Sequence, residues 1–211
     1  MKHSDFDVGR ISALSDGVFA IAMTLLVLDL GLPDTGPVTD SAAFAALLVQ
    51  QVPRFLSWLL SFALLCRLWI LDHDVLADGD TRSWGFLAWS FVFLGCISFI
   101  PFPTSLLAEH ADQPWSIVIF SATYASAGIA LAGMLQQSVK GGFFAAKQTD
   151  AERGSKRAVI LLLSTAAVAC VAAFWNPGFG ALAWCTYPIA SALIRRKARR
   201  QREAASPPAK D

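Results

Sequence analysis

The stretch Arg10–Leu28, which reads RISALSDGVFAIAMTLLVL, decides the fold of this chain. It opens with a charged signature, Arg10 followed by Ser15 and Asp16, and continues as an uncharged apolar run to Leu28. Charged side chains are costly in or near a lipid bilayer, so an arginine and an aspartate here need a specific role. At about 1.5 Å per residue, the wider apolar segment 12–32 is long enough to cross the hydrocarbon core. The stretch therefore predicts a membrane-spanning helix that does more than anchor the chain.

The composition of the whole chain is also typical of a membrane protein. Its 211 residues are 55% hydrophobic and 16% charged, whereas soluble domains average about 25% charged residues. The net charge of +1 gives no indication of a nucleic-acid partner, and we expect none. The four cysteines all lie in apolar segments and lack metal-ligand spacing, so we predict neither a metal site nor a cofactor.

Apolar runs of membrane length predict an all-α, polytopic membrane protein with six transmembrane helices per subunit. The predicted spans are 12–32, 53–71, 84–107, 115–138, 156–175 and 178–194. Residues 41–52 precede Pro53 and either extend the second span or form a short helix in the membrane interface. We favour the interfacial helix, because proline suits the first turn of a helix and so marks the start of the second span.

The distribution of basic residues predicts the orientation in a cell membrane. The loops 33–40 and 108–114 contain acidic residues but no lysine or arginine, whereas the loops of the other side and the C-terminal tail are rich in both. By the positive-inside rule both termini are cytoplasmic, as an even number of spans requires. Arg54 is the exception and is expected near the outer interface. We divide the chain into a six-helix transmembrane domain, residues 1–194, and a basic, disordered tail, residues 195–211.

The first span has two different faces on a helical wheel. At about 100° per residue, Ile21, Leu25 and Leu28 fall within an arc of about 60°, with Thr24 at its edge. Asp16 lies roughly 140° from Ile21, so we expect a buried carboxylate that faces neighbouring helices. Spacing alone leaves two alternatives open: the stripe faces lipid or core, or it lines a pore. For Asp16, a structural pairing with an arginine, histidine or indole is favoured over direct contact with an ion.

Three motifs of this sequence occur together in one known family. They are the Arg10-x-x-x-Leu-Ser-Asp signature, the Ser-Phe pair at 61–62 with Trp-x-x-x-His at 69–73, and Ile-Pro-Phe-Pro-Thr at 100–104. In combination they resemble the transmembrane protein 175 family, which comprises potassium channels of endosomes and lysosomes and single-repeat bacterial relatives. Leu14 departs from the pattern, because the family usually has phenylalanine at this position.

The resemblance implies a homotetrameric cation channel that has no classical selectivity-filter loop and whose first helices line the pore. By position, Ile21, Leu25 and Leu28 match hydrophobic rings that close the pore, and Thr24 matches a hydroxyl layer tied to potassium preference. A structural network would hold this helix in register, formed by Arg10, Leu14, Ser15, Asp16, Trp69 and His73.

Two acidic residues fall near the predicted outer mouth. Four copies each of Asp29 and Asp34 would raise the local concentration of cations there. The alternative, that they are ordinary solvated loop residues, stays open.

We therefore predict a passive, potassium-preferring channel whose partners are potassium ions, membrane lipid and further copies of the chain. The alternative is a proton-conducting or proton-coupled membrane transporter, which would need ionisable residues at mid-membrane. The charged residues of the predicted spans lie toward the helix ends, which favours the channel. We expect no enzyme activity, because the sequence has no nucleophile elbow, H-E-x-x-H motif or phosphate loop.

Overall fold

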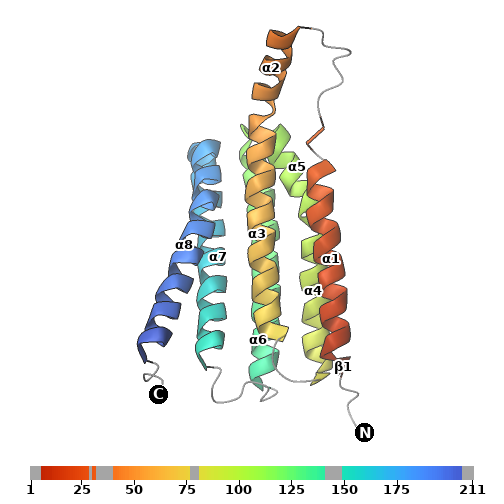
Figure 1. Cartoon of the computed structure of the whole chain (residues 1–211), viewed down its shortest axis with the longest axis vertical. Helices are drawn as coiled ribbons and strands as arrows, with labels where there is room; N and C mark the ends of the chain where they lie inside the picture. Colours follow the sequence, from red (N-terminus) through yellow and green to blue (C-terminus); the bar gives the residue numbers. More distant parts are fainter. Residues whose placement is uncertain (1–5, 29, 32–39, 77–80, 141–148, 206–211) are drawn as a thin grey trace, which may run out of the picture.

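The computed structural model describes residues 6–28, 30–31, 40–76, 81–140 and 149–205, whose long helices run along one common direction (Figure 1). The elements in chain order are β1 (Phe6–Asp7), α1 (Val8–Leu28), α2 (Ser41–Gln50), α3 (Val52–Leu76), β2 (Thr81–Arg82), α4 (Trp84–Phe99), α5 (Pro101–Glu109), α6 (Pro114–Lys140), α7 (Thr149–Trp175) and α8 (Pro177–Ala205). α1 begins and α8 ends at the same end of the bundle, which we call the lower end (Figure 1).

Within the described residues, five helical segments are long and apolar enough to cross a membrane. They are Val8–Leu28, Val52–Leu76, Trp84–Glu109, Pro114–Val139 and Gly154–Trp175. The chain is therefore an all-helical, multi-pass membrane protein apart from two very short strands. The sixth predicted span coincides with the first part of α8, which packs against α7. This helix contains Pro188 and continues into a basic segment, and its membrane crossing stays a prediction.

The two strands, which were not anticipated, tie the lower end of α1 to the start of α4. β1 and β2 pair antiparallel, with Phe6 opposite Arg82 and Asp7 opposite Thr81. The carboxylate of Asp7 also accepts a hydrogen bond of 2.7 Å from the backbone N–H of Gly9 in the first turn of α1. An N–H in the first turn has no partner within the helix, so this contact stabilises the helix start.

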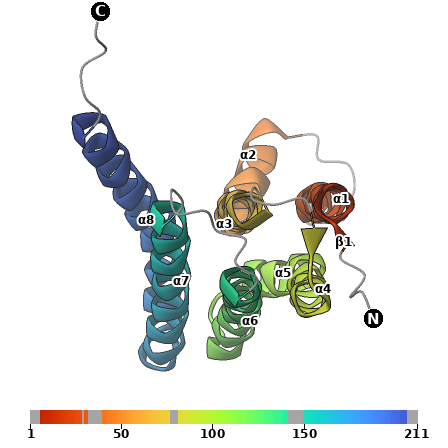
Figure 2. The same cartoon turned by 90° about the horizontal axis from the view of Figure 1, so that it is seen from below.

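The third predicted span is broken near its upper end, between α4 and α5. Pro101 and Pro103 have no N–H and cannot donate to the carbonyls four residues earlier. The carbonyl of Ile97 accepts a hydrogen bond of 3.2 Å from the N–H of Ile100 instead, which tightens the last turn of α4. Figure 2 shows that α5 then runs from α4 toward α6. The prolines thus produce a bend between α4 and α5.

α6 lies between α4 and α7, where small residues allow these neighbouring helices to approach closely (Figure 2). A Cβ added to Gly133 would come within 2.4 Å of the Trp89 ring on α4. One added to Gly128 would come within 2.9 Å of the Leu162 side chain on α7. Small residues at such positions are typical of helix packing in membranes.

The C-terminal segment differs from its prediction. Residues 195–205, which we expected to be disordered, continue α8 as a helix to Ala205. Alanine, arginine, lysine, glutamine and glutamate all have high helix propensity, and this segment contains no glycine or proline. Residues 206–211 of the predicted tail lie outside the described residues.

Candidate pore-lining helix and its anchoring network

One face of α1 packs against α3, α4 and α5. The buried residues of α1 recur every three or four positions; they are Ile11, Ser15, Phe19, Ala22 and Leu26. Phe19 also contacts the ring of Phe93 on α4, with centroids 6.0 Å apart. This spacing is that of a single helix face, so the rest of the bundle covers only one side of α1.

The opposite face of α1 carries the predicted aliphatic stripe and is uncovered in the single chain. Ile21, Leu25 and Leu28 are 61%, 42% and 72% exposed. Leu14, which we assigned to the packing network, is 46% exposed and falls on the same stripe, within about 20° of Ile21 on the wheel.

Thr24 lies at the edge of this uncovered face. Its hydroxyl donates a hydrogen bond of 2.8 Å to the backbone carbonyl of Ile21 in the preceding turn. The hydroxyl proton is thereby occupied, and the exposed oxygen presents its remaining acceptor capacity outward. The side chain can therefore offer an oxygen to a cation, but it has no second proton to donate.

A buried hydrogen bond joins α1 to α3. The hydroxyl of Ser15 donates to the carboxylate of Asp72, and both side chains are almost completely buried. The buried carboxylate is therefore that of Asp72, which we did not predict, and the prediction that Asp16 is buried is wrong. The sequence does indicate a role for Asp72. It lies three residues after Trp69, and this spacing places both residues on one helix face.

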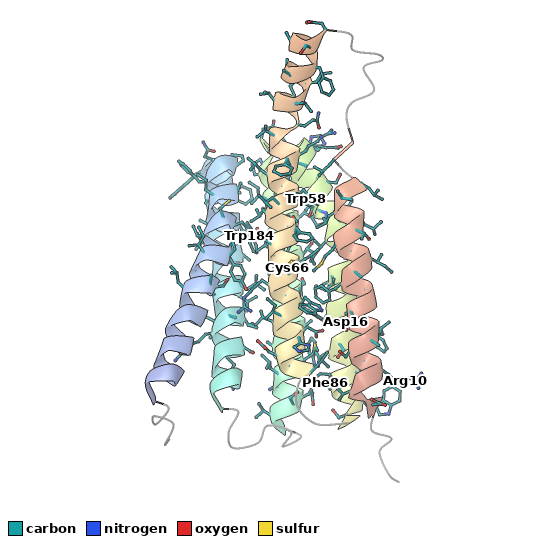
Figure 3. The ribbon with its side chains drawn as sticks, in the orientation of Figure 1. Arg10, Asp16, Trp58, Cys66, Phe86 and Trp184 are labelled. Atoms are coloured by element: carbon teal, nitrogen blue, oxygen red, sulfur yellow. The ribbon has the colours of Figure 1, made fainter. Side chains whose placement is uncertain are left out.

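Asp16 is instead exposed in the single chain and binds an indole. The Nε1–H of Trp69 donates a hydrogen bond of 2.8 Å to its carboxylate. The Trp69 ring stacks in turn on His73, with centroids 5.8 Å apart. Figure 3 shows Arg10 near the lower end of α1 and Asp16 higher on the same helix. Trp69 therefore contacts Asp16 directly, and His73 contacts Trp69.

The second and third motifs of the sequence also meet, in the upper half of the bundle. The hydroxyl of Thr104 on α5 donates to the hydroxyl oxygen of Ser61 on α3 at 2.8 Å, and both side chains are buried. The hydroxyl of Tyr124 on α6 donates to the backbone carbonyl of Ser61 at 3.4 Å. The break before α5 thus places Thr104 where it links α5 to α3.

The predicted outer-mouth acids lie outside the described residues, at positions 29 and 34. At the upper end the structure instead joins Arg54 of α3 to Glu109 of α5, with 3.4 Å between Nη2 and Oε1. Arg54, the exception in the charge pattern, therefore pairs with an acid at the same end. A partly exposed pair of this kind contributes little to stability but marks the polar boundary of the bundle.

Comparison with known proteins gives a consistent family assignment. The family model described as "Endosomal/lysosomal potassium channel TMEM175" matches residues 10–101. A potassium channel of Chamaesiphon minutus is 36% identical over 126 residues, which cover 60% of this chain and 61% of that protein. The match thus spans about three fifths of the relative's own length. The endosomal/lysosomal proton channel TMEM175 of Homo sapiens is 35% identical over 119 residues, covering 53% of this chain and 23% of the human protein.

A solved structure extends the likeness to almost the whole chain. The crystal structure of a lysosomal potassium-selective channel TMEM175 homolog from Chamaesiphon minutus superposes with a TM-score of 0.77 at 25% identity. The superposition covers 88% of this chain and 96% of that one. Three motifs, a family model and a fold therefore agree.

Proposed function

Because the chain belongs to the TMEM175 family of ion channels, we propose that it is a passive, potassium-preferring cation channel of the cell membrane. It would work as a homotetramer in which four copies of α1 surround the pore. The observation that carries the proposal is the uncovered aliphatic face of α1, held in place by buried contacts on its other face. A second observation supports it, since the Chamaesiphon relative is named a potassium channel.

The chemistry of the uncovered face suits a channel that closes without charged groups. Four isoleucines at position 21 would form an apolar ring that empties of water and so blocks ions. Leu25 and Leu28 would add further rings, and Thr24 would supply oxygen ligands of modest field strength. Potassium loses its hydration shell more easily than sodium, so weak oxygen ligands favour potassium.

The membrane orientation follows from the two ends of the bundle. Arg10, Lys156 and Arg157 lie in the lower part of the bundle, near the helix starts of α1 and α7. The basic segment at the end of α8 reaches the same end. By the positive-inside rule this end faces the cytoplasm and carries both termini.

Proton conduction is the second candidate, because the human relative is named a proton channel. Above Asp16 the uncovered face of α1 is aliphatic apart from Thr24, so the proposed mechanism contains no chain of titratable groups there. We therefore assign potassium as the main permeant ion, and a flux measurement with a proton indicator separates the two candidates.

The test compares two isoleucine variants in reconstituted liposomes. Ile21→Asn places an amide in the proposed constriction, so the ring should stay hydrated and the potassium flux should rise several-fold. Ile160→Asn on α7 is the matched control, because Ile160 is 65% exposed but lies outside α1. We expect its flux to equal that of the unchanged protein.

Three results would contradict the proposal. The first is an equal flux in the Ile21 variant and the unchanged protein. The second is an equal rise in the Ile160 control. The third is a flux of protons that persists when potassium is replaced by an impermeant cation and exceeds the potassium flux.

A further inference from the structure

The rotation of α8 against the rest of the bundle is fixed by buried contacts on one of its faces. The Nε1–H of Trp184 donates a hydrogen bond of 2.9 Å to the hydroxyl oxygen of Ser121 on α6, and both side chains are fully buried. A Cβ added to Gly180 would come within 2.9 Å of the backbone carbonyl of Ala169 on α7. Tyr187 and Ser191 are buried on the same face, at the spacing of three or four positions that one helix face requires.

The opposite face of α8 carries an uncovered apolar stripe. Its large residues are each between 58% and 64% exposed and fall within an arc of about 80° at 100° per residue. We call this set the outer stripe; its members are Phe179, Leu182, Ile189 and Leu193. Lipid tails are as apolar as leucine, so they can cover such a stripe.

Aromatic residues mark the upper level of α8 in the membrane. Trp115 at the start of α6 and Trp175 at the end of α7 are 64% and 88% exposed. The ring of Trp115 meets that of Phe174 edge to face, with centroids 5.9 Å apart. Exposed tryptophans are typical of the boundary between lipid tails and water. The upper boundary therefore lies near the turn between α7 and α8.

The length of α8 then places the lower boundary. From Pro177 to position 195 the helix rises about 28 Å, at about 1.5 Å per residue. This rise is close to the thickness of a hydrocarbon core, about 30 Å. If α8 crosses the membrane as predicted, lipid tails end and headgroups begin near position 195.

A cluster of basic residues begins at this level. Positions 195–202 of α8 hold six arginine or lysine residues and no acidic one. The register of the helix divides them into two sets of three. The outer triad continues the outer stripe, within about 60° of its centre, and consists of Arg196, Lys197 and Arg200. The inner triad lies nearer to the continuation of the buried face and consists of Arg195, Arg199 and Arg202.

The lower end of α8 also leaves the bundle. Figure 2 shows that it points away from the other described helices. The outer triad is therefore placed at the periphery of the described chain, at the level of the headgroups. Phosphate is the group that guanidinium donors recognise best, because they can form paired hydrogen bonds to its oxygens.

We propose that the outer stripe and the outer triad together bind an anionic phospholipid of the cytoplasmic leaflet. The stripe would cover an acyl chain, and the triad would bind the headgroup phosphate. Basic clusters immediately cytoplasmic of a spanning helix are typical of contacts with anionic lipid. The inference goes beyond the proposed channel function, because it rests on the predicted membrane crossing of α8 and not on the pore.

The test measures lipid binding by native mass spectrometry of the purified full chain in a mild detergent. The probes are dioleoyl phosphatidylglycerol and dioleoyl phosphatidylcholine, which share their acyl chains and differ in headgroup charge. The unchanged chain should bind phosphatidylglycerol roughly tenfold more tightly. Equal affinity for the two lipids would overturn the proposal.

Two triple variants distinguish the outer triad from the overall positive charge. Replacing all three residues of the outer triad by glutamine should weaken phosphatidylglycerol binding roughly tenfold. The control replaces the inner triad by glutamine and should keep most of the affinity. Both variants lose the same charge, retain three basic residues for the membrane orientation and keep a high helix propensity. Unchanged binding in the outer variant, or an equal loss in both variants, would overturn the proposal.

A charge-preserving variant and a soluble competitor complete the test. Arg196→Lys combined with Arg200→Lys retains both positive charges and should retain the preference for phosphatidylglycerol over phosphatidylcholine; its loss would count against the proposal. Glycerol phosphate, which has the phosphate but no acyl chains, should not displace phosphatidylglycerol at equal concentration. Displacement would identify a site for soluble phosphate compounds and reject the lipid site. Any of these negative results leaves the channel proposal standing, because that proposal rests on α1.

Discussion

At the scale of single residues, two hydrogen bonds define how α1 is held. Ser15 binds the buried carboxylate of Asp72, and Trp69 binds the carboxylate of Asp16. Both partners lie on α3, so they fix the rotation and the height of α1 against that helix. The direction in which Ile21 points depends on this rotation. Ser15, Asp16 and their partners on α3 therefore act on the proposed pore although none of them lies on the aliphatic stripe.

Ser15→Ala tests the buried hydrogen bond. It removes the donor and leaves the Asp72 carboxylate buried without it, which should cost about 1–3 kcal/mol of stability. The midpoint of thermal unfolding in detergent should therefore fall. Ser98→Ala is the control, because the Ser98 hydroxyl is exposed and donates to the carbonyl of Gly95 in its own helix. An unchanged midpoint for Ser15→Ala would mean that the carboxylate finds another partner.

Thr24→Ala tests the hydroxyl layer. We take the Thr24 oxygen to favour potassium over sodium by about 1 kcal/mol of binding free energy. Its loss should then lower the ratio of potassium to sodium permeability roughly fivefold. Reversal potentials in planar bilayers measure this ratio. Thr186→Ala is a close control, since the Thr186 hydroxyl is also exposed and donates to a carbonyl of the preceding turn, that of Ala183. A fixed ratio in the Thr24 variant would remove this residue from ion selection.

At the scale of elements, glycines and prolines determine how the helices meet. Pro101 and Pro103 break the third span and turn α5 toward α6, which brings Thr104 to Ser61. Gly133 lets the Trp89 ring lie directly on the backbone of α6. The buried face of α1 then packs on the surface that α3, α4 and α5 provide. The position of the candidate pore helix thus depends on contacts between other helices.

Gly133→Ala tests the contact between α4 and α6. The new methyl group has no room against the Trp89 ring, so we expect a loss of about 1–3 kcal/mol, seen as a lower unfolding midpoint. Gly95→Ala is the control; its Cβ would meet nothing within 4 Å, and alanine favours a helix over glycine by about 1 kcal/mol. Combining Gly133→Ala with Trp89→Phe should recover part of the loss. A double variant that is no more stable than Gly133→Ala alone would argue against a direct clash.

At the scale of the whole molecule, charged groups lie toward the two ends of the bundle, as the proposed passive pore requires. The basic helix ends gather at the lower end, and one partly exposed ion pair lies at the upper end. The uncovered face of α1 runs between these ends without a charged side chain above Asp16 in the described residues 17–28. A coupled carrier would need titratable or ion-binding groups along such a path.

The prediction at this scale is potassium transport without coupling. In liposomes loaded with potassium, efflux should follow the potassium gradient, and its rate should not depend on an opposing gradient of sodium or protons. Uphill potassium movement driven by either gradient, with a fixed stoichiometry, would identify a carrier instead. A potassium-selective electrode, used with liposomes that contain no added potassium ionophore, measures both cases.

The sequence by itself determined the membrane class, the helical segments and the stripe on α1. These are local properties: the length of an apolar run, the positions of prolines and a period of about 3.6 residues. The break before α5 could be predicted for the same reason, because a missing N–H acts on the carbonyl four residues earlier.

Only the tertiary structure decided which carboxylate is buried and which helix faces stay uncovered. Asp72 and Ser15 are 57 positions apart in the chain, so their contact depends on how α1 and α3 are turned toward each other. The same rotation exposes Asp16 and places Leu14 on the stripe with Ile21. The same apolar residue types are found in a protein core, against lipid and in contacts between subunits. Only the packing of the other helices shows which of these environments a given side chain has.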